Sequence, residues 1–157
     1  MRLLTVLLLF FTPLAYSAES DDISHFLDGF RQAAAESDFD VYFSHFTADS
    51  TFLGTDASER WSVEQFKQYA KPAFDQGKGW SYKNLERNIV IAAGGDIAWF
   101  DEIMFNEGLG KCRGTGVLIN HDGQWKLATY SLTMLIPNDI AYGVGEQSRA
   151  ADEAADH

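Results

Sequence analysis

The second half of the chain contains successive runs of β-type residues separated by short turns, at residues 80–92, 97–105, 111–119 and 125–136. The segments AGGD at 93–96 and HDGQ at 121–124 are typical of hairpins, because Gly and Asp accept the positive φ angles of tight turns. Successive hairpins place each strand antiparallel to the next one. This part of the chain therefore predicts an antiparallel sheet.

Helical patterns precede the sheet. Residues 21–37 carry apolar side chains at the spacing of one helix face, and residues 38–46 carry a second, shorter pattern. Ser62 followed by Gln65 is a capping box, which predicts that a third helix starts after a short strand at 51–53. Helices followed by an antiparallel sheet indicate an α+β domain in which the helices pack on one sheet face.

The two ends of the chain differ in composition from the middle. Residues 1–17 begin with Arg2, continue with an apolar stretch and end in small residues, which is typical of a signal peptide. We therefore expect a protein that is exported to the periplasm or secreted, with no membrane attachment after cleavage. Residues 139–157 are acidic and Ala-rich and predict a disordered tail, with a marginal helix as the alternative, which leaves residues 18–138 as one folded domain.

Charge and composition narrow the classes of partner. The formal net charge is −11 at pH 7, whereas nucleic acids and anionic membranes select basic surfaces, so neither is an expected partner. Cys112 is the only cysteine, which rules out an intramolecular disulfide. The four His residues lack the spacing of metal ligands, and we expect neither a metal nor a cofactor. Aromatic residues make up 14% of the chain, which suits an apolar ligand site.

Centring each turn on its Gly residues predicts the strand registers and, through them, the two faces of the sheet. The first hairpin then pairs Asn88 with Asp101, and the last pairs Thr115 with Tyr130. One face is mostly apolar and aromatic, and we expect it to lie under the helices. It comprises Glu86, Asn88, Val90, Trp99, Asp101, Ile103, Phe105, Arg113, Thr115, Val117, Ala128, Tyr130 and Leu132. An error of one residue in a turn would move that hairpin's side chains to the opposite face.

Asp101 and Arg113 are diagonal neighbours on this expected inner face, at roughly 7–8 Å, a distance that an Arg side chain spans. Buried charges persist when they are paired and hydrogen-bonded. The pair is therefore either a structural ion pair or the polar floor of a cavity, which Asn88, Thr115 and Tyr130 would complete.

The opposite face places Arg87 directly across from Glu102, which we interpret as a cross-strand surface pair. The same face carries large apolar side chains, among them Phe100, Met104 and Leu118. Apolar surface turned away from the helices predicts a second copy of the chain packed against it, and hence a homodimer through the outer sheet face.

Five local stretches stand out: FLGTDASERW at 52–61, GKGWSY at 77–82, AWFDE at 98–102, CRGTGVL at 112–118 and LIPN at 135–138. Together with the order of helices and strands, they resemble the nuclear transport factor 2-like superfamily in its SnoaL-like branch. The resemblance implies an α+β cone in which three helices and a curved antiparallel sheet enclose a pocket. It also implies that Trp61 lies near the pocket mouth, although a hydrophobic staple ahead of Ser62 is an alternative role for this residue.

The resemblance implies three alternative functions and does not choose among them. The first is a domain that binds a small apolar or amphipathic molecule in its pocket. Its expected ligand-binding residues are Trp61, Asn88, Trp99, Arg113, Thr115 and Tyr130. The second is a cofactor-independent isomerase or cyclase of the SnoaL type, for which the resemblance nominates Asp101 as the base. The third is an oligomerisation module like the association domain of calcium/calmodulin-dependent kinase.

Overall fold

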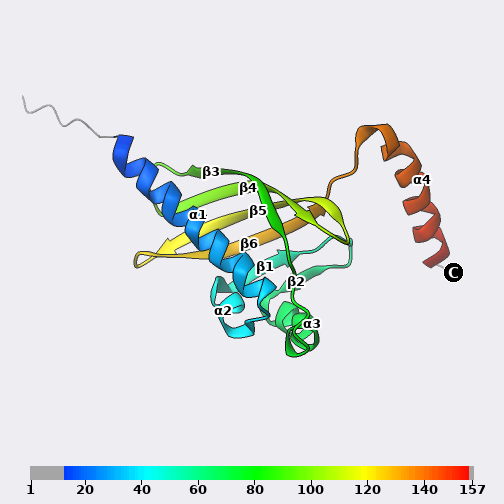
Figure 1. Cartoon of the computed structure of the whole chain (residues 1–157), viewed down its shortest axis with the longest axis horizontal. Coiled ribbons are helices and arrows are strands. Elements are labelled where there is room, and N and C mark those ends of the chain that lie inside the picture. The colour runs from blue at the N-terminus through cyan, green and yellow to red at the C-terminus, as the bar shows by residue number, and fades with distance from the viewer. Residues whose placement is uncertain (1–12, 156–157) are drawn as a thin grey trace, which may run out of the picture.

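The computed structural model describes residues 13–155. In chain order the elements are α1 (Pro13–Ala35), α2 (Phe39–Ser44), β1 (Phe46–Leu53), β2 (Arg60–Ser62), α3 (Val63–Asp75), β3 (Lys83–Ile91), β4 (Ile97–Asn106), β5 (Gly110–His121), β6 (Gln124–Met134) and α4 (Asn138–Ala155). Helix α1 crosses one face of the sheet, while α2 and α3 lie near one end of it (Figure 1). The expected α+β class is confirmed.

The six strands form one sheet in the order β2-β1-β6-β5-β4-β3. Neighbouring strands are antiparallel except β1 and β6, which run parallel. The sheet is therefore mixed, whereas the sequence predicts a purely antiparallel one. The reason is that β1 comes from the helical half of the chain and joins the last strand of the hairpin series.

Side-chain caps define where α2 and α3 begin. The Asp38 carboxylate accepts a hydrogen bond from the Val41 N–H at 3.1 Å. At the start of α3 the Ser62 hydroxyl accepts from the Gln65 N–H, and Gln65 Oε1 accepts from the Ser62 N–H at 2.9 Å. The predicted capping box is confirmed, and it fixes the direction in which the chain enters α3 directly after Trp61.

The registers of the first two hairpins agree with the sequence prediction. Asn88 pairs with Asp101 in β3 and β4, and Ile103 pairs with Arg113 in β4 and β5. The turn residues determine both registers, because they adopt the positive φ angles of tight turns. Gly95, for example, has φ 76°.

The last hairpin departs from its predicted register. Close to the turn, Leu118 pairs with Leu127 as expected, but an irregularity follows between Val117 and Leu118. Beyond it Tyr130 lies opposite Gly116 instead of Thr115. One extra residue in β6 reverses the direction of every side chain after it, so Tyr130 moves to the face opposite the predicted one.

The prediction of which sheet face lies under α1 is wrong. The covered face contains Ala98, Phe100, Glu102, Met104, Cys112, Leu118, Leu127 and Tyr130, all of them buried. On the other face Trp99 is 48% exposed and Arg113 is exposed. The sequence pattern misleads because the covered face includes Arg87 and Glu102, which resemble surface charges, and Gly114, which has no side chain to count.

The two ends of the chain add little to this packing. Helix α4 (Asn138–Ala155) covers most of the predicted tail at 139–157, projects away from the sheet (Figure 1) and buries none of its residues. Most of the predicted signal peptide lies outside the described residues, and its last part, 13–17, belongs to α1. Within residues 13–155, no helix is both long and apolar enough to cross a membrane.

Candidate functional site

A cavity of about 170 Å³ lies between α1, α3 and the covered face of the sheet. Aromatic side chains form most of its wall. It is lined by Phe30, Arg31, Ala34, Tyr42, Phe52, Gly54, Thr55, Glu59, Trp61, Phe66, Tyr69, Trp80, Tyr82, Met104, Leu109, Tyr130 and Leu132. Apolar walls with a few polar groups are typical of small-molecule sites.

The stretch FLGTDASERW forms one side of this cavity. Glu59 folds back over Gly54, where an added Cβ would lie 2.1 Å from the Glu59 carboxylate, so only Gly fits there. The Glu59 carboxylate also accepts a hydrogen bond from the Asp56 N–H at 3.2 Å. The turn delivers Trp61 to the cavity, where its ring stacks on half-exposed Tyr69 at a centroid distance of 4.4 Å. Because Tyr69 is 54% exposed, we call the side of the cavity lined by Trp61 and Tyr69 its mouth.

Several of the rings in the cavity wall are nearly parallel, although Phe30 is inclined to Tyr130 by 60° and Tyr42 to Phe66 by 66°. The Trp61 and Phe66 planes differ by 8°, and those of Phe52 and Phe66 by 17°. Trp80 lies within 19° of Phe66, and Tyr130 lies within 19° of Phe52. The near-parallel rings come from β1, β2, α3, β6 and the segment before β3. The tertiary fold therefore aligns them, because no single sequence motif contains them all.

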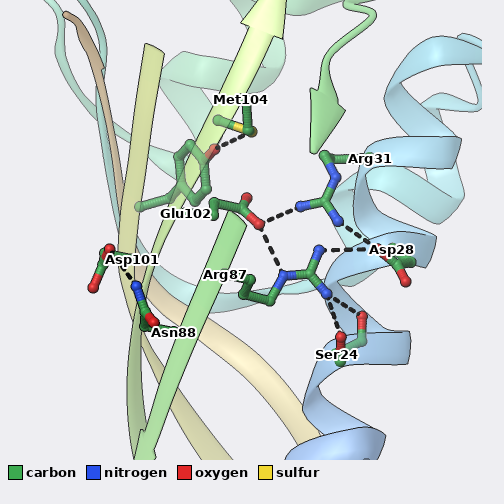
Figure 2. A network of polar contacts seen from close by, with 9 residues as sticks. Ser24, Asp28, Arg31, Arg87, Asn88, Asp101, Glu102 and Met104 are labelled. Carbon is green, nitrogen blue, oxygen red and sulfur yellow. Dashed lines mark hydrogen bonds and ion pairs between the residues drawn. The ribbon is translucent and has the colours of Figure 1, made fainter. Parts of the chain in front are cut away.

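A buried carboxylate lies behind the inner end of the cavity. The Glu102 side chain is 0% exposed, and its Oε2 accepts from Arg31 Nη1 at 2.5 Å and from Arg87 Nε at 3.0 Å. Figure 2 shows both guanidinium groups pointing at Glu102, one from α1 and one from β3. Of these three side chains, that of Arg31 reaches the cavity wall.

Helix α1 completes this charge network. Asp28 accepts from both Arg31 and Arg87, and Arg87 also donates to the hydroxyl and the carbonyl oxygen of Ser24 (Figure 2). Ser24, Asp28 and Arg31 lie three to four residues apart, so they share one side of the helix. The network therefore fastens α1 to β3 and β4 at one edge of the sheet, and it holds the Arg31 guanidinium at the cavity wall.

Glu102 remains incompletely paired. Its Oε1 is buried without a hydrogen-bond partner among the described residues. Burial raises the pKa of this carboxyl above its ordinary value, while the Arg31 guanidinium opposes the shift. A carboxylate of this kind is a candidate acid or base, yet it lies behind the cavity wall instead of on it.

Tyrosine hydroxyls supply further polar groups at the cavity. Burial raises the pKa values of Tyr42 and Tyr130 well above the ordinary value, and it raises the pKa of Tyr82 to about 12. All three stay neutral at physiological pH and serve as hydrogen-bond donors. The Tyr130 hydroxyl lies 4.0 Å from the sulfur of Met104, which is a weak acceptor and leaves the hydroxyl available to a ligand.

The structure brings together two of the predicted ligand-binding residues, Trp61 and Tyr130. The others lie on the uncovered face of the sheet, away from the cavity: Asn88, Trp99, Arg113 and Thr115. The predicted base Asp101 is there too, where its carboxylate accepts from Asn88 Nδ2 at 3.2 Å (Figure 2). Placing these residues inside the pocket was wrong, because α1 packs on the opposite face.

The polar residues that sequence reasoning missed are Arg31, Arg87 and Glu102. The pairing of Arg87 with Glu102 is confirmed, but its interpretation as a surface pair is wrong, since both side chains are buried. The sequence did contain a signal that Arg31 would face the sheet. Arg31 follows Leu27 by four residues and precedes Ala34 by three, which is the spacing of the apolar face of α1.

The described residues contain no group of His, Cys, Asp and Glu side chains that could hold a metal ion. The cavity wall itself carries two charged side chains, Arg31 and Glu59, at separate places. What the arrangement offers is an apolar volume with a guanidinium and several hydroxyl donors.

These features define a class of protein. The helices cover one face of a six-strand mixed sheet, which is the arrangement of the nuclear transport factor 2-like and cystatin-like cone folds. The chain belongs to the SnoaL-like domain family, whose match spans residues 23–137. A comparison with curated proteins finds no match.

Solved structures with the same fold are distant in sequence. A cystatin-like domain of unknown function from Nostoc punctiforme has 13% identity and a TM-score of 0.68, covering 89% of this chain and 96% of that one. A putative scytalone dehydratase from Novosphingobium aromaticivorans has 12% identity and a TM-score of 0.66, covering 80% and 89%. The association domain of C. elegans CaMKII has 16% identity and a TM-score of 0.63, covering 76% and 98%. At these identities the similarity establishes the fold alone.

Proposed function

We propose that this protein is an exported domain that binds a small apolar or amphipathic molecule in the cavity between α1, α3 and the sheet. The observation that carries the proposal is the cavity itself, an apolar volume of about 170 Å³ walled by aromatic rings. A fully packed core of the same composition would leave no such space, because protein interiors normally contain few voids larger than a water molecule.

The polar groups at the cavity support an amphipathic ligand. Arg31 and Tyr130 reach the wall from α1 and β6, and Glu59 lies beside the mouth residue Trp61. Few polar groups in an apolar pocket fix the orientation of a ligand, whereas its apolar contacts supply most of the affinity.

A fluorescence titration with N-phenyl-1-naphthylamine, a neutral apolar probe, tests the proposal. We expect saturable binding with one site per chain. The variant Leu132→Trp should abolish it, because the larger side chain fills the cavity from β6. Ile119→Trp makes a similar addition on the exposed, uncovered face and should leave binding unchanged. Absence of saturable binding, or equal binding by both variants, would refute the proposed function.

A second copy of the chain is the protein partner that we propose, and the uncovered face of the sheet is its surface. This face exposes Val90, Ile97, Trp99, Phe105 and Ile119, each by 37% or more. Large apolar side chains gathered on one exposed sheet face favour association. The fold similarity to the CaMKII association domain agrees with an assembly role for this surface.

The second candidate function is proton transfer of the isomerase or cyclase type. The proton-transfer function is favoured by the buried Glu102 carboxyl, one oxygen of which has no partner among the described residues, and not by Asp101, which is half-buried on the uncovered face. The test is proton–deuterium exchange at the α-carbon of 2-tetralone, an enolisable aromatic ketone, followed by NMR. Exchange above the solvent background that is lost in Glu102→Gln would establish this chemistry, whereas equal exchange with and without protein would exclude it for this ketone.

A further inference from the structure

We propose that the molecule bound in the cavity is flat, aromatic and anionic, with its negative oxygen group directed at Arg31. This inference rests on the proposed binding function and adds the chemical class of the ligand. Two independent features carry it: a set of near-parallel rings in one part of the cavity wall and the uneven distribution of charge at the inner end of the cavity.

Near-parallel rings form one part of the cavity wall. There, Trp61, Phe66, Trp80 and Phe52 lie within 8–19° of their stacked neighbours. The cavity-lining rings of Phe30 and Tyr42 cross this set, with 60° between Phe30 and Tyr130 and 66° between Tyr42 and Phe66. Aromatic pairs accept either arrangement, so a run of parallel rings is not the automatic result of packing many of them together.

A flat ligand ring that enters in the same orientation would extend this stack. All four of these rings line the cavity, so part of the surface of each borders empty volume. Stacked aromatic contacts contribute free energy beyond the area they bury, and a puckered saturated ring of the same size cannot make them. The wall therefore discriminates between flat and puckered molecules.

The charges behind the inner end are unbalanced within the buried region. The side chains of Arg31 and Arg87 are 10% and 6% exposed, and that of Glu102 is 0% exposed. The second acid of the network, Asp28, is 60% exposed. Two buried cations thus face one buried anion, and the remaining negative charge lies in solvent, where its effect is screened. An anionic group arriving from the cavity side would balance the buried charges directly.

Arg31 retains donors for such a group. Among the described residues its hydrogen bonds go to Glu102 and Asp28. A guanidinium has five N–H donors, so donors remain for carboxylate oxygens. Glu59 determines the direction of entry, because its carboxylate lies among the mouth residues and repels an anionic group that points outward. The acidic end of the ligand therefore points inward.

Isothermal titration calorimetry with a matched set of probes tests the inference on the whole chain without its predicted signal peptide. 2-Naphthoate is flat and anionic, 2-naphthamide is flat and neutral, and decahydro-2-naphthoate is anionic and puckered. Decanol is a flexible neutral control. We expect 2-naphthoate to bind at least about tenfold more tightly than each of the other three, since a charge-assisted hydrogen bond and a stacked ring each contribute on this scale.

Two variants test whether Arg31 is responsible for the preference for 2-naphthoate. Arg31→Gln should reduce the affinity for 2-naphthoate to that for 2-naphthamide, and it should leave the affinity for 2-naphthamide unchanged. Arg113→Gln removes the same group from the uncovered face and should change neither value. If Arg31→Gln does not fold, the probe series on the wild-type protein decides alone.

The possible outcomes distinguish a failure of this inference from a failure of the proposed binding function. Equal affinity for 2-naphthoate and 2-naphthamide would overturn the anionic group, and equal affinity for 2-naphthoate and its decahydro analogue would overturn the flat site. If decanol or N-phenyl-1-naphthylamine binds in the cavity and 2-naphthoate does not, the binding function stands and this inference falls. If none of these probes binds, both fall.

Discussion

The Nη1 atom of Arg31 lies 2.5 Å from Oε2 of Glu102, and this contact joins the first helix to strand β4 of the sheet. Arg87 contacts the same oxygen from the neighbouring strand at 3.0 Å. The inner wall of the cavity therefore depends on a buried charge network that spans residues far apart in the sequence (Figure 2).

Glu102→Ala should destabilise the protein by about 3–5 kcal/mol, because it leaves two buried guanidinium groups without their shared acceptor. Urea unfolding followed by circular dichroism measures this change. Asp101→Ala, one residue along the same strand and on the uncovered face, should stay within about 0.5 kcal/mol of wild type. Equal costs for the two variants would contradict the assignment of the faces.

The stability of the wild type relative to Glu102→Gln should fall as pH rises from about 4 toward neutrality. Burial raises the folded-state pKa of Glu102 above its unfolded value of about 4.3, so the folded protein retains the proton over a pH range in which the unfolded chain releases it. The contribution of the protonated carboxyl is complete below that unfolded value and is lost as pH rises through the folded pKa. Unfolding free energies of both proteins at pH 4 to 8 give the difference. A difference that grows with pH would show instead that the effect of the guanidinium groups on the Glu102 pKa exceeds the effect of burial.

Gly114→Ala should destabilise the protein by about 1–3 kcal/mol through overpacking. An added Cβ would lie 2.4 Å from the Tyr130 hydroxyl oxygen and 3.0 Å from Met104 Cε. Tyr130→Phe removes that oxygen, so the double variant should be more stable than the sum of the single effects predicts. A double-mutant cycle by urea unfolding measures the coupling, and additive effects would show that the hydroxyl is not the obstacle.

His45 should titrate below 6.5, because burial lowers its pKa. Its ring lies 4.8 Å from that of Phe26 and 5.7 Å from that of Phe30, and its Nδ1 lies 2.7 Å from the Val41 carbonyl oxygen. The folded state therefore binds this proton less readily than the unfolded chain. Stability should decrease, relative to His45→Gln, as pH falls from about 7 through the folded pKa. An NMR titration of the ring protons checks the pKa directly, and a value above 6.5 would contradict the burial.

Trp99→Asp should convert the proposed homodimer to a monomer. The Trp99 side chain is 48% exposed on the uncovered face, and a buried unpaired carboxylate would oppose association there. Light scattering coupled to size-exclusion chromatography measures the mass of wild type and variant. Tyr142→Asp on α4, which alters an exposed aromatic residue outside the sheet, should leave the mass unchanged. A wild type that remains monomeric at high concentration would eliminate the dimer.

Local chemistry in the sequence determined much of the fold. The Ser62–Gln65 capping box placed the start of α3, and the Gly-rich turns placed the first two hairpins in register. These features act between residues close in the chain, so they can be read without knowing the rest of the structure.

The tertiary structure decided which face of the sheet the helices cover, and with it the identity of the site. Alternation along the strands defines two faces but not which of them receives α1. The irregularity beside Val117 moved Tyr130 to the cavity, and the packing of α1 buried Glu102 between Arg31 and Arg87 while leaving Asp101 outside. Burial depends on long-range packing, so a charged residue beneath a helix and one facing water look alike in the sequence.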